Sequence, residues 1–257
     1  FYPWFSYAHL SCHHNCPFCG IFDGQGYIIE GVMVFNGNHK GLFGYVDSPN
    51  AVIKNIGVNG VYTCNDYVGG IVAHLVNGSV MNSWFGGTII ADDTLGGIAA
   101  VCENGTILNC CCFADISGST RIGAIAGETS TASTIKYCYY GSNFDGPCGD
   151  DKATVSAVAA YRENGTEYTL ERSVYVGGNN SVMLLNALNH WVRDAAPDNR
   201  SFRFWKIDDS AESVIRVVGL HPTHLFPGDS SGLKQAMEPE DTVNTGGNPY
   251  DVNNQVE

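Results

Sequence analysis

Three cysteines and two histidines are gathered in one stretch of ten residues, SCHHNCPFCG, at positions 11–20. The thiols of Cys12, Cys16 and Cys19 have the spacing C-x3-C-x2-C, which suits the irons of an iron–sulfur cluster. Because His14 lies among them, the same stretch also offers nitrogen and sulfur ligands for tetrahedral zinc. The stretch is therefore compatible with an iron–sulfur cluster, with a zinc site or with a purely structural role.

The residues that follow decide between these interpretations. The cysteine spacing is that of radical-SAM enzymes, but their barrel needs alternating strands and helices, whereas short β-branched stretches and glycine turns follow Cys19. We therefore reject radical-SAM chemistry. A zinc site would need a second ligand pair at a matching spacing, which the sequence does not clearly provide. The preferred interpretation is an entrance loop, reduced or disulfide-bonded, with no cofactor; zinc is the weaker alternative.

Carboxylates form the second group that could do chemistry. Asp66 and Asp93 occupy equivalent turn positions in a repeat of about 27 residues, and Asp92 lies beside Asp93. Stacked carboxylates could bind calcium or act as an acid/base pair in polysaccharide cleavage. The next repeat has Thr120 at this position. We expect no Arg or Lys to lie near enough in the pattern to steady a uronate. We interpret these aspartates as turn formers, with catalysis as the alternative.

The repeat itself must position these residues. Its units begin VGGIVAHLVNGSVMNSWF at Val68, LGGIAAVCENGTILNCCC at Leu95 and IGAIAGETSTASTIKYCYY at Ile122. Apolar positions return in register in three columns: Val68, Leu95 and Ile122; Tyr62, Ile89 and Ile116; Val58, Phe85, Cys112 and Tyr140. Each unit alternates β-branched stretches with Gly, Asn and Asp turns, so it supplies short strands that bury a face only when units stack. The sequence predicts a mostly β chain folded as a right-handed parallel β-helix.

Several of these motifs resemble a known family. GLFG at 41–44, YVGGIV at 67–72 and NGTILNCCCFADISG at 104–118 are similar to GLUG-motif repeats, which are bacterial β-solenoids of the cell surface and extracellular space. The lead-in CPFCGIFDGQGYIIEGV is similar to that family's first coil. The resemblance spans roughly residues 15–227. It implies a β-solenoid fold and an extracellular or cell-surface location, and it leaves the activity open.

The chain divides into three parts. Residues 1–149 hold the β-helix coils, 150–227 hold final strands and a capping helix expected at about 180–195, and 228–257 form a flexible acidic tail or linker. The helix is expected over the last coil, because an open coil edge invites aggregation. Two terminal strands are expected within 202–222. Further domains of a longer polypeptide are expected to adjoin this chain.

Composition limits the partners. Lys and Arg number 13 against 26 Asp and Glu, so the net charge of −13 disfavours nucleic acid. The absence of a long apolar run predicts no membrane insertion. We expect a non-enzymatic adhesin-like module or stalk that binds host or cell-surface glycans or proteins through coils 41–140. The alternative is a carbohydrate-active β-helix enzyme, either a polysaccharide lyase or a glycosidase, or its accessory module.

Overall fold

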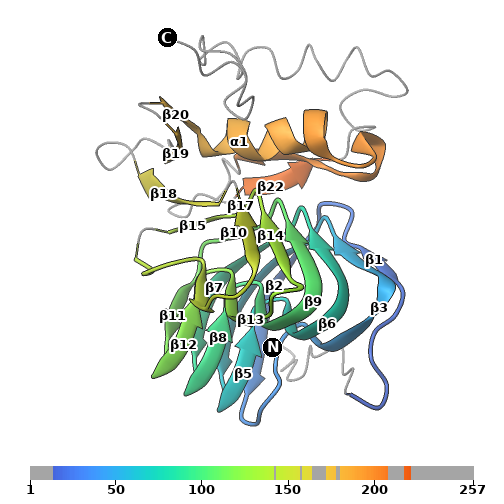
Figure 1. Cartoon of the computed structure of the whole chain (residues 1–257), viewed down its shortest axis with the longest axis vertical. Helices are drawn as coiled ribbons and strands as arrows, with labels where there is room; N and C mark the ends of the chain where they lie inside the picture. The colour runs from blue at the N-terminus through green and yellow to red at the C-terminus, as the bar shows by residue number, and fades with distance from the viewer. Residues whose placement is uncertain are drawn as a thin grey trace, which may run out of the picture.

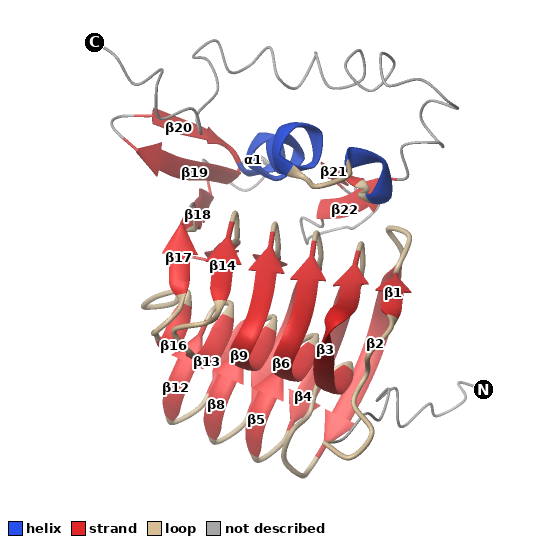
Figure 2. Ribbon diagram, turned by 45° about the vertical axis from the view of Figure 1, so that its right-hand side comes forward, coloured by secondary structure: helices blue, strands red, loops and turns tan. Residues whose placement is uncertain are grey.

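The computed structural model describes residues 14–141, 143–156, 158–163, 172–177, 180–207 and 217–220. Strands predominate in this part and form about four stacked coils of a parallel β-solenoid, with a single short helix near the C-terminal region. The predicted mostly β, parallel β-helix is therefore confirmed. Equivalent strands of successive coils lie side by side, and the helix and the last strands form a layer across their ends (Figures 1 and 2).

Three sheets run along the solenoid, because each strand pairs with its counterpart one coil further on. An eight-stranded sheet contains β1 (Ile21–Asp23), β3 (Phe43–Lys54), β6 (Val72–Met81), β9 (Ala99–Leu108), β13 (Ala126–Thr129) and β16 (Cys148–Asp150), with β14 (Thr134–Lys136) and β17 (Thr154–Ser156) beside this path. A nine-stranded sheet contains β2 (Ile28–Phe35), β4 (Gly57–Thr63), β7 (Trp84–Ile90), β10 (Cys111–Cys112), β15 (Tyr139–Gly141), β18 (Ala159–Glu163), β19 (Arg172–Gly177) and β20 (Asn180–Met183), with β11 (Asp115–Ser117) beside β7. A three-stranded sheet contains β5 (Asp66–Gly69), β8 (Asp93–Gly96) and β12 (Thr120–Gly123).

The register of the coils follows the sequence repeat. Val68 pairs with Leu95, and Leu95 pairs with Ile122. The other two predicted columns are also aligned across β4, β7, β10, β11 and β15. Their members in the central coils, such as Val58 and Phe85, are fully buried inside the solenoid. The apolar columns of the repeat therefore form the core, as predicted.

A column of glycines explains why the repeat has a fixed turn. Gly69, Gly96 and Gly123 are aligned in β5, β8 and β12. At each of them an added Cβ would overlap the carbonyl oxygen three residues further along the chain. The corner that leads from the three-stranded sheet into the eight-stranded sheet therefore has room only for glycine at this position.

The C-terminal segment Leu184–Trp205, here called the strap, lies along the side of the coils. It contains α1 (Leu184–His190), a π-helical turn (Trp191–Ala195), a 3-10 turn (Asn199–Ser201) and the start of β21 (Phe204–Ile207), which pairs with β22 (Val217–Leu220). The helix expected at about 180–195 is present, but its first four residues are strand β20 instead. The position also differs from the expected one: the strap packs on Trp84, Cys111 and Tyr139 of successive coils rather than over the last coil alone.

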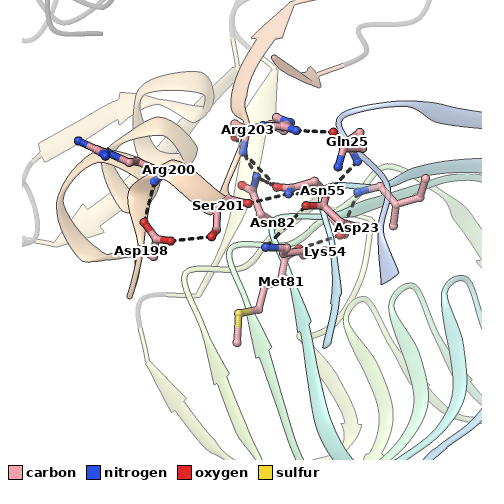
Figure 3. A network of polar contacts seen from close by, with 12 residues as sticks. Asp23, Gln25, Lys54, Asn55, Met81, Asn82, Asp198, Arg200, Ser201 and Arg203 are labelled. Atoms are coloured by element: carbon pink, nitrogen blue, oxygen red, sulfur yellow. Dashed lines mark hydrogen bonds and ion pairs between the residues drawn. The ribbon is translucent and has the colours of Figure 1, made fainter. Parts of the chain in front are cut away.

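A ladder of asparagines joins the strap to the solenoid. Asn55, Asn82 and Asn109 occupy the same corner of three coils, and each amide Nδ2 of the later two donates to the Oδ1 of the preceding one at 2.8 Å. The ladder also bonds to strap backbone: Asn55 donates to the carbonyl of Ser201 and Asn82 to that of Arg203 (Figure 3). The strap is thus hydrogen-bonded along the length of the coils.

Candidate functional site

One corner of the solenoid places unusual side chains in a left-handed backbone conformation. This corner recurs once per coil between the nine-stranded and the eight-stranded sheets. Its residues have φ between 49° and 59°: His39, Tyr67, Thr94 and Arg121. Such angles are uncommon for residues other than glycine, and asparagine tolerates them best. The corner therefore carries chemically diverse side chains in a conformation that does not favour them.

Four aromatic side chains pack together beside this corner. We call His39, Tyr45, Tyr67 and His74 the His/Tyr cluster. Its rings form two stacked pairs, each running between neighbouring coils. His39 stacks on Tyr67, with ring centroids 4.8 Å apart and planes 12° apart. Tyr45, in β3, stacks on His74, in β6, at 4.6 Å and 14°.

The two pairs are joined through their imidazoles. His39 Nδ1 and His74 Nε2 share a hydrogen bond of 2.8 Å. Burial, with a smaller contribution from His39, lowers the pKa of His74 to about 4. Burial also lowers the pKa of His39, although the charge of Asp66 opposes this effect. Both imidazoles are therefore mainly uncharged at neutral pH, and one of them donates its N–H to the unprotonated nitrogen of the other.

The cluster presents polar atoms that the described part of the protein does not use. All four side chains are partly exposed. No hydrogen bond of the Tyr45 or Tyr67 hydroxyl occurs within the part of the chain that the structure describes. Burial, followed by the charge of Glu103, raises the pKa of Tyr45, so its hydroxyl stays protonated. The cluster can thus offer uncharged donors and acceptors on rings that are already packed.

The predicted carboxylates lie at the same corner. Asp66 and Asp93 are aligned in β5 and β8, one coil apart, and Thr120 is aligned with Asp93 in β12. The expectation that no basic residue lies near them is wrong: Arg121 makes a two-point contact with Asp93, in which Nε donates to Oδ1 at 3.0 Å and Nη2 contacts Oδ2. The Thr120 hydroxyl also donates to Asp93 Oδ1 at 2.5 Å.

This ion pair fixes the charge of Asp93. The hydrogen bond from Arg121 and the smaller one from Thr120 lower the pKa of Asp93 to about 2. Arg121 Nη1 also lies 3.7 Å from Glu128 Oε2. Asp92 is exposed, beside the pair. Asp93 is therefore ionised at neutral pH and cannot serve there as a proton donor.

The cysteine-rich stretch lies only partly within the structure. Cys12 and His13 fall outside the described residues, so the zinc hypothesis stays a prediction. His14, Cys16 and Cys19 are exposed at the entrance of the first coil. Across the described ranges, no group of three or more His, Cys, Asp or Glu side chains is placed to hold a metal ion, and the cysteines are free thiols. Cys110 and Cys138 are buried in the core, as expected for small apolar side chains.

The comparisons with known proteins give no name to this arrangement. No family model matches the chain, and neither a curated protein nor a solved structure matches it significantly. Among the described residues, no helix is long and apolar enough to cross a membrane. The geometry of the site is therefore the basis for a functional proposal.

Two features of the site were missed in the sequence. The His/Tyr cluster was recoverable, since its stacked partners lie 28 and 29 residues apart and so about one coil from each other. The Asp93–Arg121 pair spans 28 residues, one more than the aligned Asp93 and Thr120. A search confined to equivalent positions passes over such diagonal neighbours.

Proposed function

We propose that this chain is a non-enzymatic binding module of an exported or surface-attached bacterial protein, like the GLUG-motif repeats that it resembles. The solenoid supplies a rigid scaffold, and the His/Tyr cluster is its ligand site. The observation that carries the proposal is the four-ring packing of the cluster, with partly exposed rings and two tyrosine hydroxyls left for a ligand.

The chemistry of the cluster favours a neutral, hydroxyl-rich ligand. At neutral pH the imidazoles are uncharged, and Asp66 and Glu103 lie close enough to affect the pKa values of His39 and Tyr45. These carboxylates and the net charge of −13 disfavour anions. Sugar hydroxyls both donate and accept, as do phenol and imidazole groups. We therefore propose neutral glycans of host or cell surfaces as the first ligand class, with protein partners second.

The rings of the His/Tyr cluster are already packed before a ligand binds, which favours affinity. The stacked rings have little side-chain freedom left to lose, so ordering costs on binding are small. Tyrosine is effective at such sites because it offers a large rigid ring and one polar atom. The site therefore needs no closing loop to hold a glycan.

The test is binding to a glycan array, followed by calorimetry with the best ligand. Tyr45→Phe and Tyr67→Phe remove only the hydroxyls and keep the stacked rings. Each is expected to raise Kd about tenfold, equivalent to about 1.4 kcal/mol. Tyr27→Phe is the matched control, because Tyr27 is an exposed tyrosine outside the cluster. Unchanged affinity in both cluster variants would remove the cluster from the proposal.

One observation favours the alternative that the chain is a carbohydrate-active enzyme. Arg121 contacts Asp93 and Glu128, so the acidic row of Asp66, Asp92 and Asp93 includes a basic residue that could hold an acidic sugar. Asp93, held ionised, would serve as a base or an electrostatic stabiliser, and another group would supply the acid. A polysaccharide panel assayed for reducing ends and unsaturated products tests this. Turnover that is lost in Asp93→Asn would replace binding by catalysis as the function.

A further inference from the structure

Exposed apolar side chains gather at one end of the solenoid. Within the described residues, every exposed large hydrophobic side chain lies between Ile21 and Ile90. Four belong to the first coil: Ile21 is 70% exposed, Tyr27 71%, Met33 47% and Phe35 52%. Exposed apolar side chains that form a group in this way mark interaction surfaces more often than isolated ones do.

The same end holds the first strands of two of the sheets. β1 and β2 are the terminal strands of the eight-stranded and nine-stranded sheets in the described part of the chain. At the other end of the nine-stranded sheet, β19 and β20 turn antiparallel and end the parallel run. Figure 2 shows β1 and β2 at one margin of the strand array and β17 and β18 at the other. An edge of free amide and carbonyl groups is a template for another strand.

Part of β2 lacks the usual protection of an edge. Its pairing with β4 is irregular between Glu30 and Val32, where Gly31 has φ +70°. This bulge and the charge of Glu30 protect the first half of the strand. The second half, Val32–Phe35, carries no charge, and it alternates buried valines with the exposed Met33 and Phe35. This half is open to pairing.

The charge of this end permits contact between copies. The chain carries −13 overall, but residues 14–40 contain two acidic residues, Asp23 and Glu30, and one basic residue, Lys40. Asp23 is further neutralised by Lys54, whose Nζ lies 3.6 Å from Asp23 Oδ2. Repulsion between two copies is therefore weakest where their first coils meet.

We propose that two copies of this chain associate through their first coils, with the Val32–Phe35 segment of β2 pairing antiparallel to the same segment of the second copy. The antiparallel arrangement follows from two-fold symmetry, which brings one edge against itself. Met33 and Phe35 then lie beside their counterparts across the new strand pair and lose part of their exposure. The nine-stranded sheet becomes continuous between the two copies. The inference does not rest on the glycan proposal, because it is argued from the edge of β2 and its exposed side chains and not from the His/Tyr cluster.

The test is the molar mass of the full chain by light scattering and analytical ultracentrifugation, from about 1 µM to about 1 mM, the range of weak association. The proposal predicts a reversible monomer–dimer equilibrium. In the double variant Met33→Lys/Phe35→Lys, lysines face lysines across the two-fold axis, and Kd is expected to rise at least tenfold. Val61→Lys is the matched control: Val61 pairs with Met33, is 42% exposed and lies one strand inside the edge. Its Kd is expected to change less than threefold.

Three results would overturn the proposal. The first is a monomer at every concentration, with far-UV circular dichroism showing a folded chain. The second is equal dissociation by Val61→Lys, which would assign association to the sheet face instead of the edge. The third is a dimer formed only after removal of residues 1–13, which would mean that the chain covers its own edge.

Discussion

Asn82 joins the strap to the coils through two of its side-chain hydrogen bonds. It is the middle member of the asparagine ladder, it is 3% exposed, and its side chain makes four hydrogen bonds. Nδ2 donates to Asn55 Oδ1 and to the carbonyl of Arg203, both at 2.8 Å. Oδ1 accepts from Asn109 Nδ2 at 2.8 Å and from Trp205 Nε1 at 2.6 Å. Asn82→Ala removes all four together.

The magnitude follows from the groups that lose their partners. Asn109 Nδ2 keeps its bond to the carbonyl of Leu188, and Asn55 Oδ1 keeps its bond from the amide of Arg203. Trp205 Nε1 and the Arg203 carbonyl lose the partner they have, which costs about 1–3 kcal/mol each. Alanine at φ 49° adds about 1 kcal/mol of backbone strain. The expected loss is about 3–7 kcal/mol, a large share of the 5–15 kcal/mol typical of a folded domain.

The assay is urea unfolding followed by far-UV circular dichroism and tryptophan fluorescence. Fluorescence reports on the strap and its contact with the coils, because Trp191 and Trp205 are buried in the strap and Trp84 of β7 is buried in the same cluster. We expect the fluorescence midpoint to fall further than the dichroism midpoint. Asn36→Ala is the control: Asn36 is exposed, has φ 59°, and isolates the backbone term of about 1 kcal/mol. If Asn82→Ala loses no more stability than this control, the ladder does not hold the strap.

Two further predictions concern protons and thiols. The pKa of His74 is lowered from 6.5 to about 4, so between these values the unfolded chain binds a proton that the folded chain does not. The free energy of unfolding therefore falls on acidification through this window, by about 3 kcal/mol, because one pKa unit is worth about 1.4 kcal/mol. Urea titrations at several pH values should show that the free energy of unfolding of His74→Gln changes less steeply with pH; an unchanged pH dependence would contradict the buried, neutral imidazole. Exposed Cys16 and Cys19 should react with a maleimide in minutes, whereas Cys102 and Cys112, whose thiol pKa values burial raises to about 11 and about 12, should react only in urea. Peptide mass spectrometry measures both, and rapid labelling of Cys112 in the folded chain would argue against its core position.

The repeat allowed the coils to be predicted because parallel stacking places residues that are one repeat apart next to each other in neighbouring coils. A shift of one coil brings Val68 onto Leu95 and Asp66 onto Asp93, so aligning the units also aligns the structure. The strap follows no such rule. Its apolar spacing predicted a helix, but its place depends on contacts such as Asn109 with Leu188, 79 residues apart. The periodicity of the sequence does not predict this contact between the strap and the coils.

The candidate site was harder to predict for a related reason. Asp66 and Asp93 stood out because equal residues recur at equal positions. His39, Tyr67 and Arg121 also share one position of the repeat, but they differ in residue type. From the sequence alone they therefore look like variable turn residues. Their meaning arises from neighbours in the adjacent column, such as His74 and Tyr45. Contacts between side chains at two different positions of the repeat can be identified only from the folded structure of the corner.

The two left-handed corners of the solenoid show how this chain separates stability from surface chemistry. Both corners require φ near +50°, a conformation that costs most L-residues about 1–2 kcal/mol and asparagine less. The strap corner uses asparagine three times running, at Asn55, Asn82 and Asn109, and then Tyr137 at φ 55°. The other corner uses none in the four coils from His39 to Arg121, and even places a β-branched residue, Thr94, at φ 57°. Asparagine would adopt this backbone conformation at lower cost, so the choice of other residues must depend on their side chains. Those of His39 and Tyr67 form part of the His/Tyr cluster, and that of Arg121 binds Asp93. The strap corner thus limits this strain to one coil in four, whereas the other corner accepts it in all four, and this difference supports the proposal that the second corner is the binding surface.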